Sequence, residues 1–223
     1  MGDPAPWTTA PVDRRTGLTI ERIRAAITNP DRPTHPNRPR LAPTGPLTKP
    51  EWDEPIPSKS SAVLVALFEE DGEARVVLTR RASTLRSHTG EVSFPGGRIE
   101  PDETAEVAAK REALEEVRMD TSAMDVVGTL STLSTMASIA GITPVVGFLP
   151  ERPTLHPDPS EVEFVFDIAL AELLVDGVFH EERWDTPWGN DRSVNFFTLP
   201  HDIVWGATAR VLRELLEMVT SDY

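Results

Sequence analysis

Cysteine is absent from the 223-residue sequence, so disulfides, thiolate zinc sites and cysteine nucleophiles are all excluded. Long apolar runs are absent too. The longest, Ala62–Phe68, falls far short of the ~20 residues that a membrane-spanning helix needs. Pro4, Pro6 and Pro11 interrupt the opening residues, so we expect no signal peptide with a basic and then an apolar stretch. These features predict a soluble cytoplasmic protein with no membrane partner.

Lysine is scarce, and two common catalytic motifs are missing. Neither a G-x-S-x-G elbow nor a Walker A loop occurs, which argues against a serine hydrolase and a P-loop NTPase. The net charge of −14 argues against nucleic acid as a partner, because nucleic-acid-binding proteins neutralise phosphates with Lys and Arg. An acidic protein can still bind an anionic phosphate compound if metal cations lie between the two.

Proline divides the chain into two parts. Twelve of the 21 prolines precede Lys59, and residues 1–58 carry a charge of about +1, whereas the remainder carries −15. Proline fixes φ and removes a backbone donor, so Pro30–Pro57 is predicted to be extended, with one short helix at Leu18–Ile27 ahead of it. We interpret 1–58 as a Pro-rich N-terminal arm that lies on the domain or reaches a partner. A disordered tail is the alternative, and residues 59–223 form the main domain.

From residue 59 onward the pattern is typical of strands with interspersed helices. Ala62–Phe68 and Arg75–Thr79 are rich in β-forming residues and are separated by Glu-Asp-Gly, which indicates a hairpin. A helix at Gly206–Val219 has a single apolar stripe and follows the last expected strand. The remaining expected elements are strands at 92–94, 126–133, 142–149, 162–167 and 194–199, a helix at 104–117 and a short helix at 169–175. This order predicts an α/β (α+β) sandwich whose mixed sheet is covered on both faces.

A group of glutamates lies on the predicted helix 104–117, just after a loop that begins with Gly96 and Gly97. At roughly 100° per residue, Glu112, Glu115 and Glu116 fall within an arc of roughly 100°. Carboxylates that close repel one another unless a cation binds them, and hard oxygen ligands suit Mg²⁺ or Mn²⁺. The alternative is a solvated acidic face neutralised by neighbouring Lys110 and Arg111.

The rest of this helix gives further expectations. Thr104 is a suitable N-cap. Small residues upstream on the glutamate face would leave room for a loop or a ligand; these are Ala105, Ala108 and Ala109. The opposite side of the helix is expected to carry Val107, Leu114 and Val117.

The glycines and glutamates together resemble the Nudix box: Gly, five residues, Glu, seven residues, then Arg-Glu-x-x-Glu-Glu. The fixed positions are occupied by Gly97, Glu103, Arg111, Glu112, Glu115 and Glu116. The resemblance implies a Nudix-type α/β/α sandwich and an enzyme that uses Mg²⁺ or Mn²⁺ to hydrolyse a pyrophosphate bond in a small nucleotide-like substrate.

One position departs from the Nudix box. Arg118 stands where the family has a glycine that ends the helix in a left-handed conformation. That conformation costs a non-glycine residue about 1 kcal/mol. We therefore expect the helix end to differ locally, without loss of chemistry because the glutamates precede it.

The resemblance also implies roles for individual residues. Glu112, Glu115 and Glu116 would bind the metal, with the carbonyl of Gly96 as a further ligand. Arg111 would orient the glutamates by charge-assisted hydrogen bonds, and Glu103 would support the junction between loop and helix. The metals would neutralise the pyrophosphate, lower the pKa of a bound water and align it for attack on phosphorus. A homodimer is an expectation from the family alone.

A second motif, from Val77 to Gly97, precedes the helix and is similar to the extra motif of the coenzyme A pyrophosphatase subgroup of Nudix enzymes. The matching positions are Arg81, Ala82, Arg86, Gly90 and Phe94–Gly97, while Val77 replaces a usual Leu and Glu100 a usual Asp. This resemblance implies cleavage of coenzyme A or a derivative into 3′,5′-ADP and 4′-phosphopantetheine. Arg81, Arg86 and the Gly96-Gly97 loop would bind the substrate, with structural salt bridges as the alternative for the arginines.

Glu161 opens a predicted strand after a Pro-rich turn and is a candidate general base or extra metal ligand. We interpret His88 as a structural hydrogen-bonding residue rather than a base. Other substrates within the family remain open: ADP-ribose, dinucleoside polyphosphates and nucleoside triphosphates. A hypothesis of another class is a non-catalytic Nudix-fold binding module. Retention of the three glutamates argues against it, and Arg118 is the feature in its favour.

Overall fold

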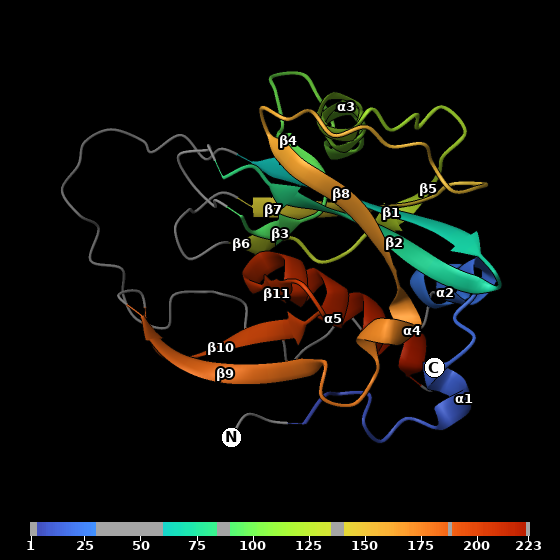
Figure 1. The fold of residues 1–223 in the computed structure, drawn as a ribbon, viewed down its shortest axis with the longest axis vertical. Helices are drawn as coiled ribbons and strands as arrows, with labels where there is room; N and C mark the ends of the chain where they lie inside the picture. Colours follow the sequence, from blue (N-terminus) through green and yellow to red (C-terminus); the bar gives the residue numbers. More distant parts are fainter. Residues whose placement is uncertain (1–3, 30–59, 84–89, 135–140, 187–188, 222–223) are drawn as a thin grey trace.

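The computed structural model describes residues 4–29, 60–83, 90–134, 141–186 and 189–221. Figure 1 shows α3 above a central sheet and α5 below it, with a smaller sheet beyond α5. In chain order the elements are α1 (Val12–Arg15), α2 (Ile20–Thr28), β1 (Ser61–Glu70), β2 (Glu73–Arg81), β3 (Val92–Ser93), β4 (Gly96–Arg98), α3 (Ala105–Val117), β5 (Asp125–Thr129), β6 (Leu133–Ser134), β7 (Gly141–Phe148), β8 (Val162–Ala169), α4 (Leu170–Leu173), β9 (Phe179–Thr186), β10 (Gly189–Thr198), β11 (Ile203–Trp205) and α5 (Gly206–Thr220).

The central sheet is mixed. Its main path runs β3-β2-β1-β7-β5, while β4 pairs with β1, β6 with β7 and β8 with β2. The β1 and β7 strands are parallel, and the β1–β2 hairpin is antiparallel, with Glu70 opposite Glu73. Asp71 and Gly72 both have positive φ, as a two-residue hairpin turn requires. The smaller sheet has the order β11-β10-β9. The expected sandwich with a mixed sheet covered on both faces is confirmed.

The β1 strand is buried on both faces because a helical layer covers each side of the sheet. Alternate residues from Ala62 to Phe68 pack under α3, in a core rich in small side chains. Val65 and Leu67 point the other way, into a larger core. This two-sided burial explains why β1 forms the longest apolar run of the sequence instead of an alternating pattern.

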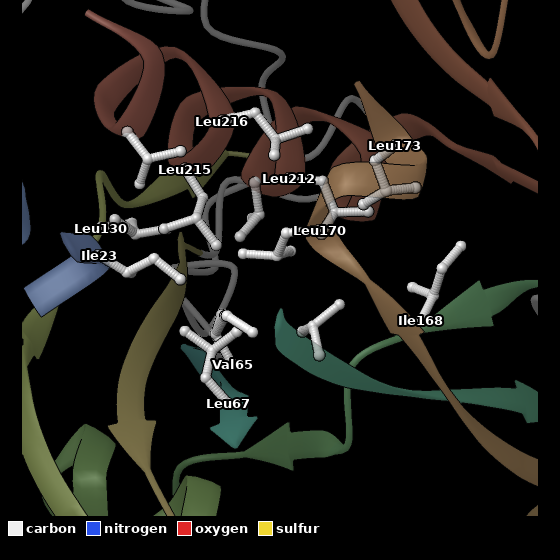
Figure 2. Close-up of a cluster of buried hydrophobic side chains, with 14 of the residues drawn as sticks. Ile23, Val65, Leu67, Leu130, Ile168, Leu170, Leu173, Leu212, Leu215 and Leu216 are labelled. Atoms are coloured by element: carbon white, nitrogen blue, oxygen red, sulfur yellow. The ribbon is translucent and has the colours of Figure 1, made fainter. Parts of the chain in front are cut away.

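The larger core lies between the central sheet, α5 and α4. Figure 2 shows Leu212, Leu215 and Leu216 of α5 above Val65 and Leu67 of the sheet. The apolar stripe predicted for the last helix is therefore its buried face. Among the described residues no helix is long and apolar enough to cross a membrane.

The described part of the N-terminal segment packs into this same core. Trp7 stacks on Phe197 at 6.1 Å between ring centroids and meets Phe179 edge-on at 5.2 Å. Leu18 and Ile23 are fully buried, and the carbonyl of Leu18 accepts a hydrogen bond from the Ala74 N–H of β2. The predicted helix at 18–27 corresponds to α2, whereas the extended segment predicted for 30–57 lies outside the described residues.

Two predictions of secondary structure are wrong. The strand expected at 126–133 is divided into β5 and β6, which pair with β7 in antiparallel registers on either side of residues 130–132. The strand at 194–199 is not the last one, because β11 follows it and pairs with it before α5 begins. The β9 strand had no counterpart among the expected elements, since charged residues dominate its middle.

Candidate active site

The α3 helix carries the glutamate group and has well-defined ends. Thr104 is its N-cap, with the side-chain hydroxyl accepting from the Val107 N–H at 3.2 Å, as predicted. At the other end Arg118 adopts φ 55° and ψ 29°, the left-handed conformation that glycine favours. The expected local difference at the helix end is therefore wrong: arginine takes up the conformation that a glycine would adopt.

The buried side of α3 carries Glu116 and borders the side that carries Glu112 and the exposed Glu115. Ala108 and Ala109 are fully buried in the core against β1, and Ala105 is partly buried against it, so the strand fills the room that we assigned to a loop or ligand. Val107 and Leu114 are half-exposed, while Val117 is buried, so these three residues do not share one environment. Small side chains thus bring the helix close to the sheet and carry its carboxylates to the sheet edge.

The strand β4 brings two glycines against the glutamates. The N–H of Gly96 donates to Oε2 of Glu116 at 3.1 Å. A Cβ on Gly97 would overlap the carboxylate of Glu112, and one on Gly96 would overlap the backbone of Ala62 and Val63 in β1. Gly96 therefore requires glycine because the β1 backbone approaches too closely for any side chain, whereas a side chain at Gly97 would displace the carboxylate of Glu112.

Arg111 binds the acidic residues around it through all three guanidinium nitrogens. Its Nε and Nη2 bind the two carboxylate oxygens of Glu103 at 2.8 and 3.0 Å, and Nη2 also donates to the Arg98 carbonyl at 3.0 Å. Its Nη1 lies 3.0 Å from both Glu112 Oε1 and Glu115 Oε2. Because so many hydrogen bonds hold the guanidinium group of Arg111 in place, it fixes the rotamers of the surrounding carboxylates.

Glu116 is the most deeply buried of the three glutamates, with 3% of the residue exposed. The pKa of Glu116 is raised to about 7, mainly by burial and to a smaller extent by the nearby carboxylates of Glu112 and Glu161, while the Gly96 N–H and Arg81 oppose the shift. Burial also raises the pKa of Glu112 above its ordinary value. Glu115, by contrast, lies at the exposed edge of the helix. The cluster therefore has more negative charge than its surroundings compensate.

Glu161 lies close enough to add to this negative charge, since its carboxylate raises the pKa of both Glu112 and Glu116. Backbone bonds hold the preceding loop against the end of α3. The N–H of His156 donates to the Val117 carbonyl at 2.9 Å, and that of Asp158 donates to the Glu116 carbonyl at 2.7 Å. These bonds satisfy carbonyls at the helix end that would otherwise lack partners.

Of the two arginines predicted to bind substrate, Arg81 lies at the glutamate cluster. It is the last residue of β2, and its Nη1 is 3.7 Å from Glu116 Oε1. Arg86 and His88 lie outside the described residues.

The residues present fit a divalent cation by their chemistry. The donors are hard carboxylate oxygens, and the pKa values of Glu112 and Glu116 are raised mainly by burial and also by neighbouring carboxylates, both of which a bound cation would offset. Within the described residues no three acidic or histidine side chains stand arranged to hold a metal ion. Arg111 Nη1 contacts one carboxylate oxygen of Glu112 and one of Glu115, so these two residues would use their other carboxylate oxygens to bind a cation.

Residues 58–188, more than half of the chain, match the family model described as the NUDIX domain. This chain belongs to the Nudix hydrolase family. It is 43% identical over 163 residues to "Nudix hydrolase 22, chloroplastic" of Arabidopsis thaliana, covering 69% of this chain and 53% of the relative. It is 39% identical over 158 residues to "Uncharacterized Nudix hydrolase NudL" of Cronobacter sakazakii, covering 70% and 81%. The chain thus spans about half the length of the Arabidopsis relative.

Among solved structures, a Nudix hydrolase from M. smegmatis, RenU, is similar with a TM-score of 0.46 and 22% identity. The match covers 52% of this chain and 73% of that one.

The ion pair of Arg81 with Glu116 is of the kind that the sequence left open as the alternative for the arginines. Two other features of this Nudix hydrolase site were not foreseen from the sequence, namely the Arg98 carbonyl that anchors Arg111 and the backbone bonds between the 150–161 loop and α3. Each joins residues that are far apart in the chain or involves main-chain atoms, so no residue pattern indicates it.

Proposed function

We propose that this Nudix hydrolase cleaves the pyrophosphate bond of coenzyme A or a coenzyme A derivative in a reaction that needs Mg²⁺ or Mn²⁺. The observation that carries the proposal is the cluster of Glu112, Glu116 and Glu161 beside the Gly96-Gly97 strand, with Arg81 next to it. Such a cluster attracts divalent cations, and cations together with an arginine attract a pyrophosphate.

In the proposed reaction the residues of the site either bind the metal or position the residues that bind it. Glu112, Glu115, Glu116 and the carbonyl of Gly96 would hold the metal, which when bound supplies positive charge for the pyrophosphate and the attacking water. Arg111 holds Glu112 and Glu115 in fixed positions through the fork anchored on Glu103.

In this reaction Glu161 accepts a proton from the water that attacks phosphorus. Glu161 directly precedes β8, and its carboxylate is close enough to Glu112 and Glu116 to raise the pKa of both. Arg81, together with Arg86, binds phosphate oxygens of the substrate through the guanidinium group. The absence of side chains at Gly96 and Gly97 lets β4 lie directly against β1 and the Glu112 carboxylate, next to the proposed metal ligands.

The choice of coenzyme A rests on the sequence motif from Val77 to Gly97, which includes Arg81. The position of Arg81 beside Glu116 supports the binding of a pyrophosphate, because a residue of that motif lies next to a proposed metal ligand. ADP-ribose, dinucleoside polyphosphates and nucleoside triphosphates are the competing substrates.

To test the proposal, the purified protein is incubated with coenzyme A and either Mg²⁺ or Mn²⁺, and the products are identified by mass spectrometry. We expect 3′,5′-ADP and 4′-phosphopantetheine, formed only with metal. Glu116→Gln should lower the rate by at least about 100-fold, because it removes one charged ligand from the site. Glu106→Gln is the matched control: it lies on the same helix but is exposed and paired with Lys110.

The outcomes separate chemistry from substrate. Metal-dependent cleavage of ADP-ribose or a nucleoside polyphosphate, with coenzyme A left intact, would overturn the choice of coenzyme A alone. If no pyrophosphate compound is cleaved, the protein is instead a binding module.

Three expectations from the sequence stay predictions. They are a cytoplasmic location, a homodimer, and the division of the chain into an arm at 1–58 and a domain at 59–223.

A further inference from the structure

Arg81 is held in place by its backbone at the end of β2. Its N–H donates to the Glu91 carbonyl at 3.0 Å, and its carbonyl accepts from the Gly90 N–H at 3.2 Å. The next residue, Ala82, donates to the Glu161 carbonyl at 2.8 Å. The strand therefore delivers the Arg81 side chain to the side of the sheet where Glu116 and Glu161 meet.

The carboxylate of Glu116 is buried, so its ionised form is stabilised by a cation close to it. Its Oε2 accepts from the Gly96 N–H, and its Oε1 faces Arg81 Nη1 at 3.7 Å. Within the described residues Arg81 is the cation paired with Glu116, whereas Arg111 binds Glu103, Glu112 and Glu115. A buried carboxylate without any compensating charge is strongly unfavourable, so the pair stabilises the protein when no metal is bound.

The contact between Arg81 and Glu116 is nevertheless loose. A separation of 3.7 Å is too long for a hydrogen bond. The buried Nε of Arg81 also makes no hydrogen bond within the described part of the chain. Arg111, in contrast, uses all three of its nitrogens. The guanidinium of Arg81 thus supplies charge to Glu116 while keeping donor capacity for an incoming oxygen ligand.

We infer that Arg81 is an internal counter-ion of the metal site, which compensates Glu116 in the metal-free protein and competes with the metal for it. When a metal ion takes over the charge of Glu116, the guanidinium becomes available to an anionic substrate. The inference rests on the proposed function in one respect, namely that Glu116 binds a divalent cation. It goes beyond that function by making metal the first ligand to bind and by linking its binding to that of the substrate.

The test measures Mn²⁺ affinity directly, by calorimetry on the purified full-length protein without substrate. Arg81→Gln removes the competing charge, so we expect the Kd for Mn²⁺ to fall by about three- to tenfold. Thermal unfolding of the same variant without metal should begin at a lower temperature, and Mn²⁺ should raise its Tm by more than it raises that of the wild type.

Arg80→Gln is the matched control, since it removes the same charge from the adjacent residue of the same strand. Arg80 lies on the other face of the strand and pairs with Glu163 and Asp202 at 3.6 and 3.3 Å. Its Kd for Mn²⁺ should stay within about twofold of the wild-type value because general surface charge acts weakly through water. Arg81→Lys keeps the charge and should likewise leave the Kd near wild type. Arg81→Met repeats the loss of charge with an apolar stem, should the glutamine variant not fold.

The results have distinct meanings. Unchanged or weaker Mn²⁺ binding by the charge-removing variants of Arg81 would overturn the inference, as would equal tightening by Arg80→Gln. A wild-type protein that binds Mn²⁺ and cleaves a pyrophosphate would then keep its proposed function. A wild-type protein that binds no Mn²⁺ even at millimolar concentration would overturn both.

Discussion

The two faces of the central sheet are packed in opposite ways. The face under α5 is filled with leucine, isoleucine and aromatic side chains from six or more elements. The face under α3 is filled largely by alanines and small residues, and the charged side chain of Glu116 is buried at its edge. Burial of apolar area stabilises a fold, whereas burial of a charge costs free energy. The α5 face therefore contributes most of the stability from apolar burial, whereas the α3 face includes a buried charge that lowers stability.

The largest effect on stability is expected on the α5 face. Leu212 is fully buried in the larger core, so Leu212→Ala should lower the free energy of unfolding by about 3 kcal/mol through lost transfer energy and a cavity. Leu114→Ala is the control, because Leu114 is a helix leucine that is 51% exposed on α3; its effect should stay within about 0.5 kcal/mol. Urea denaturation measures both. Similar losses for the two variants would show that Leu212 does not contribute to the core of the α5 face as a buried residue should.

A smaller effect is expected from pH on the α3 face. The folded protein has a Glu116 pKa of about 7, above the ordinary 4.5. The folded state therefore keeps a proton that the unfolded state loses as pH rises. Below pH 4.5 this group leaves stability unchanged; from there to pH 7 stability falls, and above pH 7 the loss is complete.

The measurement is urea denaturation with a metal chelator, comparing wild type and Glu116→Gln. The wild type should lose about 2 kcal/mol relative to the variant between pH 4.5 and 7. Stability of the wild type that rises relative to the variant over this interval would show that burial does not dominate the pKa of Glu116.

The smallest effect is expected at the end of α3. Arg118→Gly should raise the free energy of unfolding by up to about 1 kcal/mol, because glycine adopts the left-handed conformation without strain. Turnover should change by no more than about twofold. A large gain in turnover would mean that the helix end takes part in positioning the glutamates.

Sequence patterns predicted best those structural features that depend on a single helix, strand or turn. The Asp71-Gly72 turn, the Thr104 cap and the apolar stripe of α5 are local features, and each is found as predicted. The buried side of α3 was not foreseen, since exposed Val107 and Leu114 are larger than the buried alanines. Its true packing depends on how closely β1 and β4 approach, which is a property of the tertiary structure.

The small sheet and the site contacts show the same limit. The charged sequence of β9 does not resemble a strand. The strand is stabilised instead by pairing with β10 and by a hydrogen bond from Arg213 of α5 to Glu181, neither of which a local pattern indicates. The pairing of Arg81 with Glu116 joins β2 to α3 across a separation of 35 positions. Such contacts follow from the fold as a whole and not from the spacing of residues.

The loop before β8 has a consequence for how this protein could diversify. Main-chain atoms of His156 and Asp158 attach it to α3, so the attachment does not depend on which side chains the loop carries. A substitution at His156 therefore leaves this main-chain bond in place, while the Asp158 carboxylate, which accepts from the N–H and the hydroxyl of Ser160, holds the turn that leads to Glu161. A surface beside the glutamates that tolerates changes in sequence is suited to acquiring new preferences for the part of a substrate distant from the scissile bond.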